Sequence, residues 1–576
     1  MSRLLVTLVG CLLAVCPAAA PVAARQGVSV GIVAASHPLA AEAGAEMLRR
    51  GGNAIDAMAA VQFALNVVEP QFSGIGGGGF LMLYLPDVRS EPIVLDGREA
   101  APAAATADQF LGPDGRPRAF AEAHQQGTAV GVPGTLRNVE TALRRFGTLP
   151  LSETLQPAID LAENGFAVNR FLAADIAASQ AKLASWPASA AVFLPAGRPL
   201  AAGERLRQAD LARTLRLIGD EGSDVLYHGE VGQALIAAQA QRGGRMTLDD
   251  LAAYEVKERA PVSGAYRGYR VFSMPPPSSG GLTMLQILML LEPFDLRQTG
   301  VNTPESLHLL LEATRLAYAD RGRYLGDADL VPVPIHGLIN PAYISQRRGL
   351  IDRTRANPSP APGDPWAFEP DARPLVSSAI SEDGPHTTHV TIVDGQGNLV
   401  AYTTTIEQAW GTGMLVPGYG FLLNNELTDF DFVPGGPNEV APGKRPRSSM
   451  SPTMLFDDRG PYLALGSPGG ATIITTVTEV LLNVLEHGLG LQEAIDAPRV
   501  ASSSFPSFTW EAGVGPSTLE ALRTFGHRPA AEPTSIGSVQ AALRTPDGSW
   551  IGAADRRRAG TVVVVSPAAG GGQSTP

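Results

Sequence analysis

Two adjacent threonines, Thr387 and Thr388, stand at the start of a predicted strand deep inside the 576-residue chain. Residues 389–393 (His-Val-Thr-Ile-Val) alternate as a half-buried strand does. If the peptide bond between His386 and Thr387 can break, the new α-amine becomes a general base for the Thr387 hydroxyl. The pattern is therefore compatible with a self-cleaving proenzyme, although β-propensity alone also places threonine pairs in strands.

The turn after this strand brings a second hydroxyl towards Thr387. Residues 394–398 (Asp-Gly-Gln-Gly-Asn) are typical of a tight turn, and a second strand follows them. If Val393 pairs with Leu399, the antiparallel register places Thr405 opposite Thr387. A slip of one residue would undo this arrangement.

The N-terminus has the pattern of a secretory signal peptide. Arg3 precedes an apolar run over residues 4–16, and residues 22–24 (Val-Ala-Ala) fit a small-residue cleavage site. The apolar run is shorter than the ~20 residues of a membrane span, so no membrane anchor is expected. Residues 1–24 are thus predicted to be a signal peptide, which makes the mature protein secreted or periplasmic.

Composition excludes several classes of function. Cys11 and Cys16 both lie in the predicted signal peptide, so the mature chain needs no disulfide and cannot use cysteine catalysis. The net charge of -12 disfavours a nucleic-acid partner. The longest basic run, residues 556–558, is expected to be a local surface or buried ion-pair cluster.

Length and pattern indicate a globular chain larger than one ordinary core. Residues 303–324 predict an amphipathic helix, on which His308, Glu312 and Arg315 share a face. Residues 357–373 contain five prolines and are expected to form a loose linker upstream of Thr387. The nine histidines show no metal-ligand spacing along the chain, so no metal is expected.

A set of short motifs occurs in a fixed order, and together they are much more specific than any one alone. The motifs are Gly51–Ala57, Gly76–Phe80, Leu95–Glu99, Val132–Gly134, Pro275–Gly281, Tyr318–Arg321, Thr387–His389, Gly411–Gly413, Leu423–Glu426, Arg445–Thr453 and Gly466–Gly470. On these motifs the chain resembles the γ-glutamyltranspeptidase family (γ-glutamyltransferase, glutathione hydrolase) over nearly the whole mature sequence, and its bacterial, lidless members in particular.

The resemblance implies an α+β protein with the four-layer (αββα) N-terminal-nucleophile hydrolase fold, in which two stacked β-sheets lie between helical layers. It also implies self-cleavage between His386 and Thr387. The expected products are a large subunit, residues 25–386, and a small subunit, residues 387–576, which stay together as a heterodimer. Residues 568–576 are expected to be a disordered tail by composition.

The implied reaction is covalent catalysis by Thr387 without a cofactor. Its hydroxyl would attack the γ-glutamyl amide of glutathione or a related compound, and water or an amino-acid or peptide acceptor would then resolve the acyl-enzyme. By the resemblance, Thr405 supports the nucleophile, and Gly469 and Gly470 form the oxyanion hole. Arg98 is expected to hold the substrate α-carboxylate.

The remaining substrate contacts also come from the resemblance. Ser448 and Ser449 are expected to donate hydroxyl groups to the α-carboxylate. Asp429 and Glu426 are expected to accept the α-ammonium group. Position 407 is Glu where many family members have Asn, and Glu407 is expected to keep the ammonium contact.

A short connection distinguishes this chain from family members that have a lid loop. Only residues 431–443 separate Asp429 and Phe430 from Lys444, and lidded members carry an insertion here. An open cleft is therefore expected, and it could admit bulky γ-glutamyl substrates such as poly-γ-glutamate.

Two other functions remain open. A cephalosporin or glutaryl acylase uses the same scaffold but binds an acyl group without an α-amine, and Arg98, Asp429, Ser448 and Ser449 favour the γ-glutamyl alternative. A non-catalytic periplasmic binding protein would need neither the Thr387 hairpin nor the Gly469–Gly470 pair.

Overall fold

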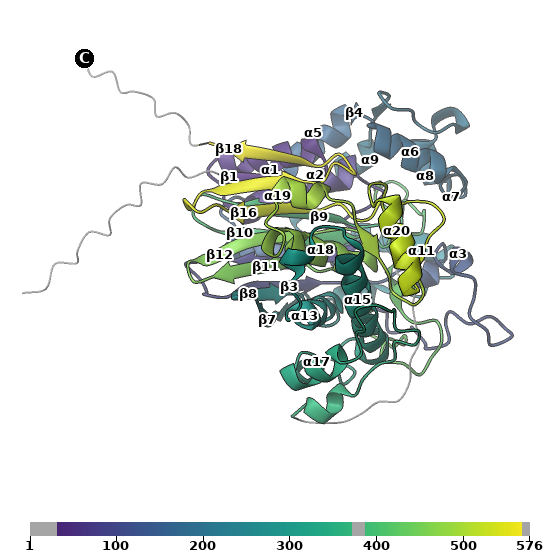
Figure 1. Cartoon of the computed structure of the whole chain (residues 1–576). Coiled ribbons are helices and arrows are strands. Elements are labelled where there is room, and N and C mark those ends of the chain that lie inside the picture. Colours follow the sequence, from purple (N-terminus) through teal and green to yellow (C-terminus); the bar gives the residue numbers. More distant parts are fainter. Residues whose placement is uncertain (1–30, 371–385, 567–576) are drawn as a thin grey trace, which may run out of the picture.

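The computed structural model describes residues 31–370 and 386–566 (Figure 1). The predicted signal peptide (residues 1–24) and tail (568–576) lie outside the described residues. None of the described helices is long and apolar enough to span a bilayer.

Two antiparallel sheets organise the chain. The first has seven strands in the order β18 (Thr561–Val565), β1 (Gly31–Ala35), β9 (Thr388–Val393), β10 (Leu399–Thr405), β2 (Gly78–Tyr84), β3 (Ile93–Gly97) and β6 (Lys257–Arg259). The second has six strands in the order β17 (Trp550–Ala554), β16 (Gln540–Arg544), β12 (Gly460–Gly466), β11 (Thr453–Asp457), β8 (Tyr269–Ser273) and β7 (Val262–Tyr266).

The two sheets are stacked, and helices cover their outer faces (Figure 1). On the first sheet lie α1 (Pro38–Arg49), α2 (Ala54–Val68) and α4 (Thr135–Phe146), with α5 (Leu151–Asn164) packed against α2. On the second lie α13 (Gly280–Leu291), α18 (Thr472–Leu485) and α19 (Leu491–Asp496), with α15 (Pro304–Tyr324) packed against α13.

Strand alternation divides the hydrophobic core. On β2, Leu81 and Leu83 face the α1–α2 side, whereas Phe80 and Met82 face the second sheet. This follows from the period of two in a strand, and both faces of the first sheet are therefore buried.

Smaller elements complete the chain. The remaining helices are α3 (Phe120–Ala123), α6 (Arg170–Ala178), α7 (Gln180–Ala184), α8 (Pro187–Phe193), α9 (Ala209–Glu221), α10 (Asp224–Tyr227), α11 (Glu230–Ala240), α12 (Leu248–Ala252), α14 (Leu296–Thr299), α16 (Ile335–Leu338), α17 (Pro341–Arg348) and α20 (Pro516–Phe525). Short strands are β4 (Phe166–Ala167), β5 (Arg205–Leu206), β13 (Val500–Ala501), β14 (Ser507–Trp510) and β15 (Arg528–Pro529). Single 3₁₀ turns are η1 (Gly127–Ala129), η2 (Pro195–Gly197), η3 (Pro365–Phe368) and η4 (Glu426–Asp429).

The β9–β10 hairpin has the predicted register. Val393 pairs with Leu399, and Thr388 pairs with Thr404. The Asp394 carboxylate accepts hydrogen bonds from the backbone N–H groups of Gln396 and Asn398, which closes the turn. The prediction that this turn brings Thr405 to Thr387 is therefore confirmed.

The prediction of a loose linker over residues 357–373 is wrong for the part that the structure describes. The backbone N–H of Asn357 donates to Glu312, and that of Gly363 donates to Asp320, both on α15. The Tyr324 hydroxyl donates to the Gly363 carbonyl across 2.5 Å. Proline content signals the lack of regular structure, but buried carboxylates on a neighbouring helix still fix the segment.

Candidate active site

Thr387 immediately precedes β9 and is buried. Its hydroxyl donates to Thr405 Oγ1 across 3.3 Å, and Thr405 Oγ1 donates in turn to the carbonyl oxygen of His386 across 2.9 Å. The backbone N–H of Glu407 also donates to Thr405 Oγ1, across 2.9 Å. These contacts direct the Thr405 proton at the peptide bond that precedes Thr387.

Glu407 has an unusual backbone conformation, with φ at 74°. A non-glycine residue in the left-handed region is strained, and such strain is concentrated at functional sites. The conformation turns the chain sharply after β10, so that the Glu407 N–H reaches Thr405 while its side chain lines the same pocket.

Arg558 also contacts the nucleophile residue, and sequence reasoning missed this contact. Its guanidinium donates to the carbonyl oxygen of Thr387 across 2.6 Å and lies 3.9 Å from the Phe72 ring centroid. Phe72 stacks in turn on His386. The only feature of the sequence that pointed to Arg558 was the basic run 556–558, which was expected to form ion pairs. Arg557 does form them, with Glu511 and Asp555.

The glycine turn between β12 and α18 lies beside Thr387. Gly469 and Gly470 have φ values of 141° and 55°, a region that favours glycine. Gly470 lines the pocket that contains Thr387, whereas Gly469 is not among the lining residues. The Gly469 carbonyl instead accepts the Thr472 hydroxyl. The turn thus presents the Gly470 backbone to the pocket.

Arg98 forms the charged end of the site. Its guanidinium donates to Glu426 and, across 2.5 Å, to Asp429. Burial disfavours the charge on Arg98, but the two carboxylates outweigh this effect and raise the pKa of Arg98 above its ordinary value. Arg98 follows β3, and η4 carries both carboxylates.

Carboxyl groups outnumber positively charged groups around Arg98. Burial, reinforced by the charge of Asp429, raises the pKa of Glu407 well above its ordinary value. Burial also raises the pKa of Glu426, although Arg98 opposes this effect. Behind them, burial raises the pKa of Glu99 to about 7. The site therefore favours a ligand with a positive group next to a carboxylate.

Two serines complete the pocket. The Ser449 hydroxyl accepts a hydrogen bond across 2.8 Å from Arg321, which also donates to Ser279. Ser448 Oγ accepts the backbone N–H of Met450. Arg321 thus orients Ser449 from outside the pocket, and it belongs to a sequence motif for which no role had been predicted.

The structure brings most of the predicted site residues into one pocket. It also adds Met450 and Ile473, which carry no chemical signal in the sequence. The lining residues are Arg98, Thr387, Thr405, Glu407, Glu426, Asp429, Ser448, Ser449, Met450, Gly470 and Ile473. Of the predicted residues, Gly469 and His386 are adjacent to this set rather than part of it.

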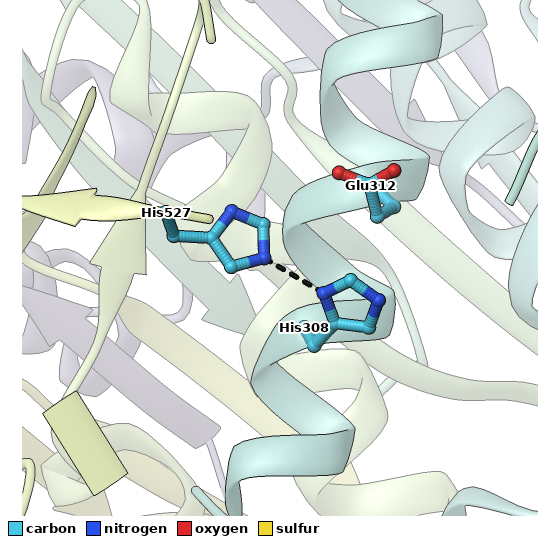
Figure 2. Close-up of side chains that lie close together, drawn as sticks. All are labelled: His308, Glu312 and His527. Carbon is cyan, nitrogen blue, oxygen red and sulfur yellow. Dashed lines mark hydrogen bonds between the residues drawn. The ribbon is translucent and has the colours of Figure 1, made fainter. Parts of the chain in front are cut away.

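A second cluster brings His308 and Glu312 on α15 close to His527 (Figure 2). Spacing along the chain could not reveal it, because His527 lies far from the other two in sequence. The ligand atoms lie within 4.8 Å of one another, and all three residues are buried. This geometry raises the question of a metal centre.

The hydrogen bonds of the two histidines argue against a metal centre. Arg315 can only donate, so His527 Nδ1 accepts its N–H across 2.6 Å. His527 Nε2 then donates to His308 Nδ1 across 2.7 Å, and His308 Nε2 donates to the Asp352 carbonyl. The two facing nitrogens are already engaged with each other, and the positive charge of Arg315 is 3.5 Å from Glu312. Arg315, His527 and His308 therefore form a hydrogen-bond relay rather than a metal centre.

Comparison with known proteins places these features in a family. The Gamma-glutamyltranspeptidase family matches residues 40–565. The glutathione hydrolase proenzyme of Bacillus subtilis (strain 168) is 46% identical over 539 residues, which cover 93% of this chain and 92% of that protein. The Acylase ACY 1 proenzyme of Pseudomonas sp. (strain SE83) is 40% identical over 543 residues, or 93% and 94% of the two chains.

A solved structure agrees with these relatives. The cephalosporin acylase from Bacillus halodurans superposes with a TM-score of 0.83 at 29% identity, over 95% of this chain and 98% of that one. The family match includes every residue of the Thr387 pocket and every strand of the two stacked sheets except β1. The chain therefore belongs to the γ-glutamyltranspeptidase family.

Proposed function

We propose that this chain is a proenzyme that cuts itself between His386 and Thr387 and then acts as a γ-glutamyltransferase and glutathione hydrolase. The relatives named as glutathione hydrolase proenzymes support this function. The products are a large subunit, residues 25–386, and a small subunit, residues 387–576, which form a heterodimer. The fold is the four-layer N-terminal-nucleophile hydrolase arrangement, a proposal supported by the stacked sheets and their outer helices.

Self-cleavage follows from the Thr387 contacts. The Thr387 hydroxyl oxygen attacks the His386 carbonyl carbon, and the C–N bond breaks as the nitrogen takes a proton. Water then hydrolyses the resulting ester, which leaves a carboxylate on His386 and a free amine on Thr387. The Thr405 hydroxyl supports the attack, because it already donates to the carbonyl oxygen on which negative charge develops.

Turnover uses the same hydroxyl with the new amine as its base. Thr387 Oγ1 attacks the γ-carbonyl carbon of the substrate, the amide C–N bond breaks, and the leaving amine takes the proton. The glycine turn at Gly469 and Gly470 supplies backbone N–H groups for the oxyanion. Water or an amine acceptor then attacks the ester and releases Thr387.

The single observation that carries the substrate assignment is the charge pattern of the pocket. One guanidinium, from Arg98, stands among three carboxyl groups, from Glu407, Glu426 and Asp429. A γ-glutamyl group offers a carboxylate to Arg98, with Ser448 and Ser449 as further donors, and an ammonium to the carboxyl groups. Its two charges thus complement both halves of the site.

The acylase alternative rests on the Pseudomonas relative named Acylase ACY 1. A glutaryl group has a carboxylate for Arg98 but no ammonium. Its carboxylate would share the single positive charge of Arg98 with Glu426 and Asp429, which already pair with Arg98, and no ammonium would offset the added negative charge. The excess of buried carboxyl groups over positively charged groups in the pocket therefore favours γ-glutamyl substrates, which bring an ammonium group.

The short connection 431–443 supports an open, lidless cleft. None of these residues, all of which the structure describes, lines the Thr387 pocket. We propose that bulky γ-glutamyl compounds, including γ-linked oligomers, can enter. If the purified enzyme cleaved γ-glutamyl anilides and left γ-linked oligomers intact, this part of the proposal would be wrong.

The predicted signal peptide supports a secreted or periplasmic location. Expression of the full chain with its leader tests this proposal. The mature large subunit should begin at Arg25 and be recovered outside the cytoplasm, whereas an N-terminus that retains residues 1–24 in a cytoplasmic fraction would contradict it.

The activity test combines intact mass spectrometry with anilide hydrolysis. Wild-type protein should yield two fragments that divide between His386 and Thr387 and should cleave γ-glutamyl-p-nitroanilide better than glutaryl-p-nitroanilide. Thr387→Ala should lose both cleavage and activity. Asp429→Asn should reduce the preference for the γ-glutamyl anilide over the glutaryl anilide. Faster cleavage of the glutaryl anilide by the wild-type protein would instead favour the acylase function.

A further inference from the structure

Three contacts hold the peptide bond between His386 and Thr387, and one of them is not a hydrogen bond. Thr405 donates to the carbonyl oxygen of His386 across 2.9 Å, and Arg558 donates to the carbonyl oxygen of Thr387 across 2.6 Å. The third contact is made by the His386 ring, which lies parallel to the Phe72 ring, with 5.8 Å between the centroids and 9° between the planes. Phe72 thus holds the residue whose carbonyl carbon is attacked in self-cleavage.

Phe72 itself is firmly placed. It is buried, and its backbone N–H donates to the Glu69 carbonyl across 3.0 Å in the turn that follows α2. The carbonyl of the preceding residue, Gln71, accepts the N–H of Trp410 across 2.9 Å, and the Gln71 side chain donates to Asp175 across 3.0 Å. A ring on a turn that is fixed in this way can serve as a rigid surface for its neighbour.

Arg558 connects Phe72 to the other side of the scissile bond. Its guanidinium carbon lies 3.9 Å from the centroid of the Phe72 ring, while the same group donates to the Thr387 carbonyl. One side chain therefore contacts both the ring beneath His386 and the residue that carries the nucleophile. A displacement of Phe72 would loosen the groups on both sides of the bond.

The His386 ring stacks in its uncharged form. Burial lowers the pKa of His386 to about 3, and the charges of Arg558 and Lys182 act in the same direction. Parallel, offset rings at this separation attract each other without a charge on either ring. Phenylalanine should therefore replace histidine at position 386, whereas an aliphatic side chain should not.

We propose that Phe72 is a positioning residue for self-cleavage, which holds the His386 ring and thereby keeps the His386 carbonyl carbon within reach of Thr387 Oγ1. The inference rests on the proposed self-cleavage and assigns position 386 a preference for a flat, uncharged ring. Phe72 forms no bond with the reacting atoms. It acts through His386 by limiting the orientations of the carbonyl group, which raises the share of molecules in which attack can occur.

Removal of the ring at either position tests the proposal. Phe72→Leu and His386→Leu keep an apolar side chain without a ring, and each should slow subunit formation by about 2- to 10-fold, the effect expected for one aromatic pair. His386→Phe restores the stack and should mature close to the wild-type rate. A time course of intact mass spectrometry measures all three variants.

Phe272→Leu on β8 is the matched control. Phe272 is also buried, packs edge-on against Phe456 and has its ring centroid 5.1 Å from the Arg270 guanidinium carbon, but it lies in the second sheet. Its loss removes contacts of the same kinds away from Thr387, so the maturation rate should be kept.

A double variant shows whether the two rings act as one unit. Phe72→Leu combined with His386→Leu should mature no more slowly than the slower single variant, because both substitutions remove the same stack. Multiplied losses would show that the rings act separately and would overturn the proposal. Urea denaturation in the Thr387→Ala background, which cannot mature, should give equal midpoints for His386→Leu and His386→Phe. A midpoint that fell in step with the maturation rate would assign the effect to folding and also overturn the proposal.

The outcomes separate this inference from the proposed function. Wild-type protein that never divides between His386 and Thr387 would refute self-cleavage itself. Normal division of the wild-type protein with equal rates for His386→Leu and His386→Phe would refute the role of Phe72 alone. This comparison decides the question even if Phe72→Leu fails to fold, because the side chain of His386 is only half-buried.

Discussion

Thr405 donates its hydroxyl proton to the carbonyl oxygen of His386, which belongs to the peptide bond before the nucleophile. The same oxygen atom of Thr405 accepts the Thr387 hydroxyl. One side chain thus orients the attacking oxygen and polarises the carbonyl that it attacks. The rate of self-cleavage should therefore be especially sensitive to substitution of Thr405.

Thr405→Ala should slow self-cleavage by about 100-fold or more, because removal of one oxyanion donor has an effect of this size in other enzymes. Thr405→Ser keeps the hydroxyl and should restore most of the rate. A time course of subunit formation by denaturing gel and intact mass measures both variants. An alanine variant that matures at the wild-type rate would show that the hydrogen bond to His386 does not assist cleavage.

Arg558 should stabilise the folded protein around Thr387 and Phe72, the two residues that it contacts. It is half-buried, and its charge opposes the increase that burial causes in the pKa of Glu69. Arg558→Met removes the hydrogen bond to the Thr387 carbonyl and leaves Glu69 buried without this counter-charge, so the free energy of unfolding should fall by about 1–3 kcal/mol. Urea denaturation of Thr387→Ala protein, which cannot mature, measures the effect on a single uncleaved chain.

A second substitution separates charge from packing. Arg558→Met combined with Glu69→Gln removes both charges and should recover part of the loss. If the double variant is as unstable as Arg558→Met, the contacts of Arg558 with Thr387 and Phe72 account for the effect rather than its charge.

Local rules predicted the hairpin well. The turn at residues 394–398 fixes the register of β9 and β10, and that register alone brings Thr405 to Thr387. The charged pocket was predictable only through the family motifs, because Arg98 and Asp429 come from segments far apart in sequence. Nothing in a single sequence signals that they share an ion pair.

The sequence did not predict which charged and polar groups make contacts inside the protein. Arg558 lies in a basic run that would usually be solvated, and its contact with the Thr387 carbonyl spans 171 positions. The proline-rich segment after Asn357 was expected to be loose for a similar reason. Its composition does not record that Glu312 and Asp320 on α15 accept its N–H groups.

Glu479 on α18 should make stability depend on pH. Burial raises the pKa of Glu479 to about 8, although a hydrogen bond from the Val500 N–H opposes this effect. A raised pKa means that the folded state binds the proton more tightly than the unfolded state. The contribution of Glu479 to the free energy of unfolding is therefore fully present below about pH 4.5, and it is lost as the pH rises towards 8.

Glu479→Gln removes this titration and should flatten the decline in stability between pH 5 and about 8. Urea denaturation of Thr387→Ala protein, with and without Glu479→Gln, measures the two profiles. Asp220→Asn on α9, at an exposed position, is the control and should leave the slope unchanged. Parallel profiles for the glutamine variant and its parent would mean that Glu479 ionises freely in the folded state.

His389 and Gly466 form a contact that should set the distance between the nucleophile strand and the glycine turn. Thr391 donates its hydroxyl to the Gln540 carbonyl, so it accepts the His389 Nε2 proton, and Thr403 donates to Nδ1. The ring is thus fixed between the sheets. A Cβ atom on Gly466 would lie 2.3 Å from His389 Cε1, closer than non-bonded atoms approach.

Gly466→Ala should therefore lower the free energy of unfolding by about 1–3 kcal/mol and slow maturation, because the ring or the turn has to move. His389→Ala removes the obstacle and its hydrogen bonds together. The double variant should lose less than the sum of the two single losses, since residues in contact couple by about 0.5–3 kcal/mol. Gly219→Ala on α9, where the nearest atom would be 3.5 Å away, should be neutral or stabilising. Additive losses for Gly466→Ala and His389→Ala would show that the ring does not hold the glycine turn at its distance from Thr387.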